Sequence, residues 1–342
     1  MKKIFSTKPL SLDYLIDEYG ILFETSSYPG GEATIAEIIK KKICRYIDAD
    51  FSEDVNGNLV VRINPSRPAS IVLEAHIDRV AAGICNISND GRLFIHSIGR
   101  LELNRYYGNL IYIINKNGEK IPAIVGGNTK LPGISSSNES VWLDAGNRQT
   151  NVDIGYIAQF LNRPKVLGSL LAASGLDNLA GVICLIETAK MSDSFDTGLI
   201  LWFSSKEEIG AITLPELDLC KESIFVSVDT CFSSECNDIP ASFIGRQSVG
   251  SGPIVLFDPS CNRELNDKII QLASDYNICI QKYQNIVPGY GLTVTNSALA
   301  KLNAKRSCLL LPIRYMHSPF EVCSIEDIDK LIRLLSILVN EN

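Results

Sequence analysis

The chain has 342 residues, of which 46% are apolar and 21% charged, so it can bury a sizeable core and is not expected to be disordered. Its 39 acidic and 32 basic residues give a net charge of −7, which argues against a protein that coats nucleic acid or an anionic membrane. No apolar run reaches about 18 residues, so no membrane span is expected.

The start of the chain and its cysteines bear on its location. Met1-Lys2-Lys3 is followed by no long apolar stretch, so we expect no secretory signal and a cytoplasmic protein. The ten cysteines include no Cys-x-x-Cys pair, so a zinc ribbon or a disulfide framework is not expected. Reduced, mostly buried thiols are the favoured interpretation.

Helical and strand patterns alternate in the first 80 residues. Apolar residues at helical spacing predict a helix from Glu32 to about Ile47. A turn at 55–58 then leads into a strand that includes 59–61, and a second short strand covers 70–75.

The pattern changes between residues 81 and 165. Short β-like runs alternate there with turn signals such as Asn89-Asp90-Gly91 and Lys116-Asn117-Gly118. Helical periodicity is largely absent. We therefore expect a small inserted β domain over 81–165, a barrel or a sandwich, within a larger domain made of 1–80 and 166–342.

Helices and strands alternate again after Gly175. A helix is expected over 179–190, and Ser324 has the residue type of an N-cap for the last helix. Strands are expected over 198–203, 224–228 and 308–311. This alternation predicts an α/β fold with a mostly parallel or mixed central sheet that is covered by helices and buried on both faces.

Histidines and carboxylates follow several of the predicted strands, and one carboxylate stands just ahead of a predicted helix. Open α/β sheets carry their sites at the carboxyl ends of strands, so these side chains are expected to meet. Imidazole and carboxylate are the ligands that a divalent metal such as zinc takes. The candidates are His76, Asp177, Glu207, Glu208, Asp229 and His317.

The number of candidates bears on the number of ions. A catalytic zinc takes three protein ligands and keeps an open position, so two histidines and at least three carboxylates are more than one ion needs. Two ions bridged by one carboxylate would use them all. Such a pair polarises a substrate carbonyl and lowers the pKa of a bound water.

Each candidate also has a structural interpretation. Asp177 has the residue type of a helix N-cap, Glu207-Glu208 could form a solvated acidic turn, and Asp229 could begin a turn. We give the third histidine, His96, a structural interpretation, because it lies in the β insert. The joint pattern favours a metal site, because unrelated causes would all have to place ligand-type residues at strand ends.

Several short stretches, taken in chain order, resemble the tetrahedral aminopeptidases, co-catalytic metallopeptidases that include glutamyl and deblocking aminopeptidases. The resemblance covers nearly the whole chain. Its most specific parts are the Glu-Glu-x-Gly stretch that begins at Glu207 and the Arg-Tyr-x-His-Ser-Pro-x-Glu stretch that begins at Arg314. The stretches are Ala75-His76-Ile77-Asp78, Leu176-Asp177-Asn178-Leu179-Ala180-Gly181, Glu207-Glu208-Ile209-Gly210, Val228-Asp229 and Arg314-Tyr315-Met316-His317-Ser318-Pro319-Phe320-Glu321.

The resemblance implies how the ligands are shared. His76 and Asp229 would bind one divalent ion, and Glu208 and His317 would bind the other. Asp177 would bridge the two ions. Zinc is the favoured metal, although cobalt and manganese accept the same ligands.

The resemblance also implies a mechanism and an assembly. A hydroxide between the ions would attack the first peptide bond of a short peptide, Glu207 would be the general base, and Asp78 would orient His76. The family fold would be an α/β catalytic domain with a PDZ-like β insert used in assembly. Dimers of such chains commonly build homo-oligomeric dodecamers.

Three positions depart from the family pattern. Arg79 stands where the family usually has Glu. We interpret it as a surface or salt-bridged arginine. The alternative is a basic group beside the site that favours acidic side chains or disturbs substrate placement. Gly99-Arg100 replaces an expected Gly-Gly pair, and Val294 replaces an Asp. None of these is a predicted ligand, so they bear on specificity more than on hydrolysis.

Two other functions remain open. A related two-metal hydrolase could act on another amide, such as an N-acyl amino acid, and a silent homologue could bind peptides or serve assembly. The family has also been associated with glucanases, but the histidines and Asp177 would have no role in a glycosidase.

Overall fold

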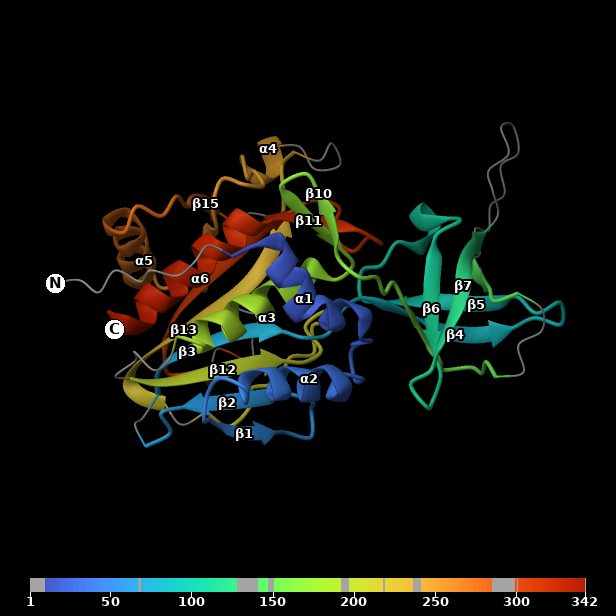
Figure 1. The fold of residues 1–342 in the computed structure, drawn as a ribbon, viewed down its shortest axis with the longest axis horizontal. Coiled ribbons are helices and arrows are strands. Elements are labelled where there is room, and N and C mark those ends of the chain that lie inside the picture. The colour runs from blue at the N-terminus through green and yellow to red at the C-terminus, as the bar shows by residue number, and fades with distance from the viewer. Residues whose placement is uncertain are drawn as a thin grey trace.

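The computed structural model describes residues 10–66, 69–127, 141–146, 151–191, 197–217, 219–235, 241–284, 299 and 301–341. A layered α/β body and a β-barrel beside it are visible in Figure 1. No helix in the described ranges is both long and apolar enough to cross a membrane. The cysteines in these ranges are free thiols.

An eight-stranded mixed sheet forms the larger body, in the order β1-β2-β12-β3-β13-β16-β14-β15. Its four central strands run parallel: β12 (Gly198–Ser204), β3 (Ala69–His76), β13 (Leu219–Phe232) and β16 (Lys305–Ile313). The flanking strands include antiparallel pairs: β1 (Asp50–Glu53), β2 (Leu59–Ile63), β14 (Ile254–Phe257) and β15 (Gln281–Gln284). The predicted mixed sheet is therefore confirmed.

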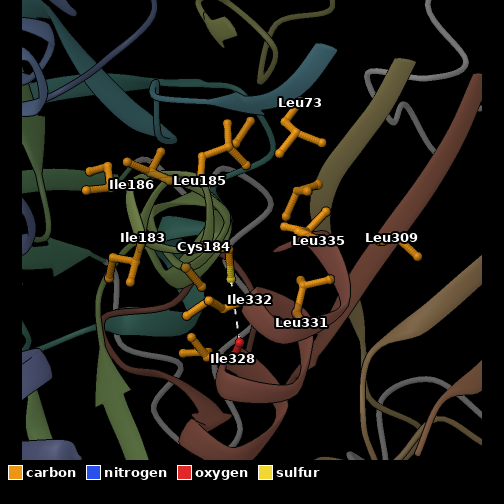
Figure 2. Close-up of a cluster of buried hydrophobic side chains, with 14 of the residues drawn as sticks. Leu73, Ile183, Cys184, Leu185, Ile186, Leu309, Ile328, Leu331, Ile332 and Leu335 are labelled. Carbon is orange, nitrogen blue, oxygen red and sulfur yellow. Dashed lines mark hydrogen bonds between the residues drawn. The ribbon is translucent and has the colours of Figure 1, made fainter. Parts of the chain in front are cut away.

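Helices pack on one face of the sheet and share one buried cluster with it: α1 (Leu12–Glu24), α2 (Ala33–Ile43), α3 (Leu176–Ala189), α5 (Arg263–Asp275) and α6 (Ile325–Asn340). Figure 2 shows how Leu185 of α3 and Leu335 of α6 meet Leu73 of β3. Each large apolar side chain buried in this way contributes about 1.5–3 kcal/mol to folding. This packing fixes the sheet whose strand ends carry the predicted site.

The opposite face of the sheet carries a smaller apolar cluster that includes Val72 and Trp202. Strand residues alternate between the two faces, so Leu73 points to the helices and Val72 to this cluster. In the described part of the chain, loop residues such as Ile212 and Leu299 complete it. The short helix α4 spans Ala241–Ile244.

The insert after β3 is a closed six-stranded barrel, in the order β4-β5-β8-β7-β6-β9. Its strands are β4 (Ala81–Ile87), β5 (Leu93–Ile98), β6 (Leu110–Ile114), β7 (Lys120–Gly127), β8 (Val141–Asp144) and β9 (Ile157–Gln159), with the 3-10 helix η1 (Leu103–Tyr106) after β5. The barrel has its own apolar core, separate from that of the sheet. Its strands lie within the range 81–165 that the sequence predicts for a β insert.

A three-stranded sheet follows the barrel: β10 (Lys165–Leu167), β11 (Leu170–Ala173) and β17 (Glu321–Ser324). The predicted N-cap at Ser324 is confirmed, because its side chain accepts the N–H of Glu326 at 3.2 Å. The helix predicted from Glu32 corresponds to α2. The helix predicted over 179–190 corresponds to α3, which begins earlier, at Leu176.

Candidate metal centre

The four strands that precede the predicted site residues are neighbours in the sheet. β12, β3, β13 and β16 lie side by side and run parallel, so their carboxyl ends meet at one edge. His76 is the last residue of β3, and Asp229 lies near the end of β13. Glu207 and Glu208 follow β12, and His317 follows β16.

A first group of ligand-type atoms is formed by His76, Asp177 and Asp229, all three of them buried. Nε2 of His76 lies 3.2 Å from Oδ1 of Asp177 and 3.5 Å from Oδ1 of Asp229. All ligand atoms of the group lie within 4.8 Å of one another. One cation could contact all three side chains.

A second group is formed by Asp177, Glu208 and His317. Nε2 of His317 lies 3.2 Å from Oδ2 of Asp177 and 3.3 Å from Oε2 of Glu208. The two carboxylate oxygens of Asp177 therefore face different histidines. The structure thus brings together the five residues predicted as ligands, with Asp177 common to both groups.

The start of α3 positions Asp177. Asp177 and Asn178 have non-helical backbone angles within this helix, and Oδ1 of Asn178 accepts the N–H of Gly181 at 3.2 Å. Asn178 therefore provides the polar cap in this turn, while Asp177 turns its side chain toward the histidines. The N-cap interpretation of Asp177 does not hold.

Both histidines present the same nitrogen to the carboxylates. Nδ1 of His76 lies 3.0 Å from the carbonyl oxygen of Asp78, and Nδ1 of His317 lies 3.2 Å from that of Arg100. Because a carbonyl can only accept, each Nδ1 carries a proton. Each Nε2 is then the atom left for a metal ion, which is the arrangement that metal-binding histidines use.

The charges of the site fit cations. Burial opposes the charged form of both histidines, but contacts of His76 with Asp177 and Asp229, and of His317 with Glu208 and Asp177, outweigh it and raise both pKa values well above the usual value. In the described residues, Oε1 of Glu208 is buried and accepts no hydrogen bond. Buried carboxylates in this number require compensating positive charge, which divalent ions would supply.

The side chain of Asp78 does not make the orienting contact with His76 that the family resemblance implies. Its carboxylate lies 3.7 Å from Nδ1 of His76, so its backbone carbonyl, and not its side chain, makes the close contact with the ring. The two carboxylate oxygens instead accept the backbone N–H groups of Glu207 at 3.0 Å and Glu208 at 3.1 Å. Asp78 thus fixes the turn that carries two of the predicted site residues.

Glu321 is a further functional candidate, at the end of the stretch that contains His317, and the sequence assigned it no role. It is fully buried, and its two carboxylate oxygens accept the backbone N–H groups of Asp177 at 3.0 Å and His317 at 2.6 Å. Burial, together with the charge of Asp177, raises its pKa to about 8. Its place only four residues after His317 is the one sequence feature that could have indicated this role.

Arg79 is buried, so its interpretation as a surface residue is wrong. Its Nε donates to Oγ of Ser27 at 3.0 Å, and its terminal nitrogens donate to the carbonyls of Phe23, Thr25 and Ser174. Burial lowers its pKa to about 10. The guanidinium therefore ties the end of α1 to the strand that precedes Asp177.

The third histidine does not join this centre. His96 is exposed on β5 and is not part of either ligand group. Val294 lies outside the described residues. The two ligand groups are therefore made from the stretches at strand ends and at the start of α3 that the sequence singled out.

The fold and the grouping of histidines with carboxylates at one sheet edge are those of a candidate metal-dependent hydrolase. The model of the M42 glutamyl aminopeptidase family matches residues 57–334, and the chain belongs to this family. It is therefore a peptidase of a metal-dependent family.

Relatives of known name agree with this assignment. The chain is 25% identical over 316 residues to a putative aminopeptidase of Acetivibrio thermocellus, covering 90% of this chain and 92% of the relative. It is 24% identical over 309 residues to the lysyl aminopeptidase of Pyrococcus furiosus, covering 84% and 86%. The fold is that of the Pyrococcus horikoshii TET1 peptidase, with a TM-score of 0.78, 23% identity and coverage of 96% and 100%; that protein can assemble into a tetrahedron or a large octahedral shell.

Proposed function

We propose that this chain is a two-metal aminopeptidase that removes the first residue from short peptides with free amino termini. The observation that carries the proposal is the position of Asp177, whose Oδ1 lies 3.2 Å from Nε2 of His76 and whose Oδ2 lies 3.2 Å from Nε2 of His317. A carboxylate shared in this way suits two bridged cations better than a single ion.

The ligands divide between the two proposed ions. His76 and Asp229 would hold one ion, Glu208 and His317 would hold the other, and Asp177 would contact both. When bound, such ions polarise the scissile carbonyl and lower the pKa of the attacking water. Zinc suits this nitrogen and oxygen ligand set, and cobalt and manganese are the alternatives to compare.

Glu207 is the proposed general base. Its Oε2 lies 4.0 Å from Nε2 of His76, so it borders the cluster without belonging to either ligand group. Burial raises its pKa well above the usual value, and Asp229 and Glu208 add to this rise while His76 opposes it. The side chain can therefore take a proton from the attacking water and hand it to the leaving amine.

Hydrolysis of matched peptides tests the proposal. Metal-loaded protein is given peptides with free amino termini that begin with acidic, basic or apolar residues, and the same peptides N-acetylated. We expect release of the first residue from free peptides alone. Turnover of the acetylated set would instead support a deacylase-like amidohydrolase, and no turnover of either set would support a silent homologue.

Glu207→Gln is the control for mechanism. We expect it to keep its metal content and to lose about 10²–10⁴-fold in turnover, which is the usual contribution of a positioned base. A variant with near-normal turnover would exclude Glu207 as the base. The metal content, measured on the same sample, separates loss of the base from loss of the ions.

We further propose that the chain forms a homo-oligomer, dimers building a dodecamer, with the insert 81–165 as the assembly domain. The support is the likeness to a peptidase that assembles into a tetrahedron. Light scattering distinguishes a dodecamer from a monomer of 37.6 kDa. A cytoplasmic location stays a prediction of the sequence.

A further inference from the structure

The barrel reaches the metal centre through the turn that follows β5. Gly99, in this turn, has φ +76, and a Cβ added to it would lie 3.3 Å from the carbonyl oxygen and 3.5 Å from the Cβ of Glu208. The same Cβ would lie 2.9 Å from Cγ1 of Val80. The backbone of the turn therefore packs directly against a predicted ligand.

The next residue of the turn contacts the second ligand of the same group. The carbonyl oxygen of Arg100 accepts from Nδ1 of His317 at 3.2 Å, which leaves Nε2 facing Asp177 and Glu208. His76 receives the equivalent contact from Asp78, within its own segment. One imidazole is thus oriented by the catalytic sheet and the other by the inserted barrel.

The turn is fixed to the barrel rather than to the sheet. Leu101 and Leu103, just after it, are 3% and 4% exposed and belong to the apolar core of the barrel. The hydroxyl of Ser97 donates to the carbonyl of Leu101 at 2.5 Å. The segment that carries the carbonyl of Arg100 is therefore anchored in the barrel.

We propose that the Gly99–Arg100 turn is a positioning element of the metal centre, so that the inserted barrel completes the half of the site made by Glu208 and His317. The inference rests on the proposed two-metal function and deepens it. It gives the insert a role in metal binding that is separate from assembly. Groups that orient metal ligands typically change metal affinity about 10–100-fold when altered.

A matched pair of glycine variants tests the proposal. Gly118, in the turn between β6 and β7 of the same barrel, has φ +79 and no atom within 4 Å of an added Cβ. Gly99→Ala and Gly118→Ala therefore introduce the same backbone strain but differ in their neighbours. Metal-stripped wild type and both variants are titrated with Zn²⁺ and Co²⁺ by calorimetry, and peptide hydrolysis is measured on the same samples.

We expect wild type and Gly118→Ala to bind two ions with affinities within about twofold of each other. Gly99→Ala should bind one ion normally and the other about 10–100-fold more weakly, with turnover recovered at high metal concentration. Equal affinities of both variants for both ions would overturn the inference. If the wild type itself binds no ion, both the inference and the proposed function are wrong.

A second variant covers the case in which Gly99→Ala does not fold. Val80→Ala is then added, because it removes the atom 2.9 Å from the new Cβ and leaves the contacts with Glu208 unchanged. Val80→Ala alone is the control. Selective weakening of one ion in the double variant, relative to this control, supports the positioning role, and unchanged binding of both ions overturns it.

Discussion

Glu321 holds the backbone of Asp177, the residue common to both ligand groups, across 144 positions of the chain. Its Oε2 accepts the N–H of Asp177 at 3.0 Å, and its Oε1 accepts the N–H of His317 at 2.6 Å. Asp78 does the same for the backbones of Glu207 and Glu208. Two buried carboxylates outside the ligand groups therefore fix the segments that carry four of the site residues.

Substitution of Glu321 by Gln is expected to weaken the metal centre. An amide offers one acceptor oxygen, so its NH₂ group would face one of the two backbone donors. A buried donor left unsatisfied costs about 1–3 kcal/mol of stability, and the displaced backbone should lower metal affinity about 10–100-fold. Urea unfolding of the stripped protein and zinc titration measure the two effects.

Glu326→Gln is the matched control, because the side chain of Glu326 is 69% exposed only five positions further along the chain. A surface change of this kind usually stays within about 0.5 kcal/mol. If both variants bound zinc with equal affinity, Glu321 would have no positioning role.

Arg79 is expected to be needed for stability rather than for substrate recognition. Its guanidinium donates to the carbonyls of Phe23 and Ser174, each at 3.4 Å, and also to that of Thr25. Arg79→Met would leave buried acceptors unpaired and should cost on the order of 3 kcal/mol. Arg79→Glu, which introduces the usual family residue, should cost more, because a carboxylate would face these carbonyl oxygens.

Urea unfolding ranks these variants against Arg105→Met, which alters an arginine whose side chain is 57% exposed. The specificity profile toward acidic and basic first residues should be the same in any Arg79 variant that folds. A selective loss of acidic substrates in Arg79→Lys would show that the residue contacts substrate instead.

The ligand groups could be predicted from the sequence because most of the ligand-type residues stand at or just after the ends of strands. His76 and Asp229 stand at or near the ends of parallel neighbours, and parallel strands bring their carboxyl ends to one edge. The residue type and the position in the chain were therefore both informative. The sequence of α1 also carries a helical pattern, because Leu15, Tyr19 and Leu22 have helical spacing and are buried. This helix was nevertheless not predicted.

The groups that orient the ligands could not be predicted in the same way. The contact of His317 with Arg100 uses a backbone carbonyl 217 positions away, and every residue type has a carbonyl. The buried position of Arg79 depends on where α1 ends relative to β11, which no local pattern sets. Tertiary packing alone decides such contacts.

Glu74 should give the metal-free protein a measurable pH dependence. It is fully buried and accepts from the hydroxyls of Ser204 at 2.5 Å and Ser227 at 2.6 Å, and burial raises its pKa to about 7. The folded state then holds a proton that the unfolded chain has lost, so stability falls as pH rises from about 4.5 to 7. Between pH 5 and 8 the resulting loss in the free energy of unfolding is about 2–3 kcal/mol.

The difference between wild type and Glu74→Gln isolates this contribution. Unfolding free energies of the stripped proteins are measured in urea at pH 5 and pH 8, and the loss between them should be smaller in the variant. Glu37→Gln, at a side chain that is 49% exposed, should keep the full wild-type loss. Equal losses in all three proteins would contradict the prediction.

Metal binding should have the opposite pH dependence to the stability of the stripped protein. The pKa values of Glu321 and Asp78 are raised to about 8 and about 7, mainly by burial, so both groups add to the loss of stability between about pH 4 and 8. His76 and His317, whose pKa values are also raised, must release the proton on Nε2 before an ion can bind there. Thermal melting with and without zinc from pH 5.5 to 8.5 should therefore show a metal-induced rise in Tm that grows with pH. A rise in Tm that does not change with pH would mean that no proton is displaced from these histidines, and that zinc binds elsewhere.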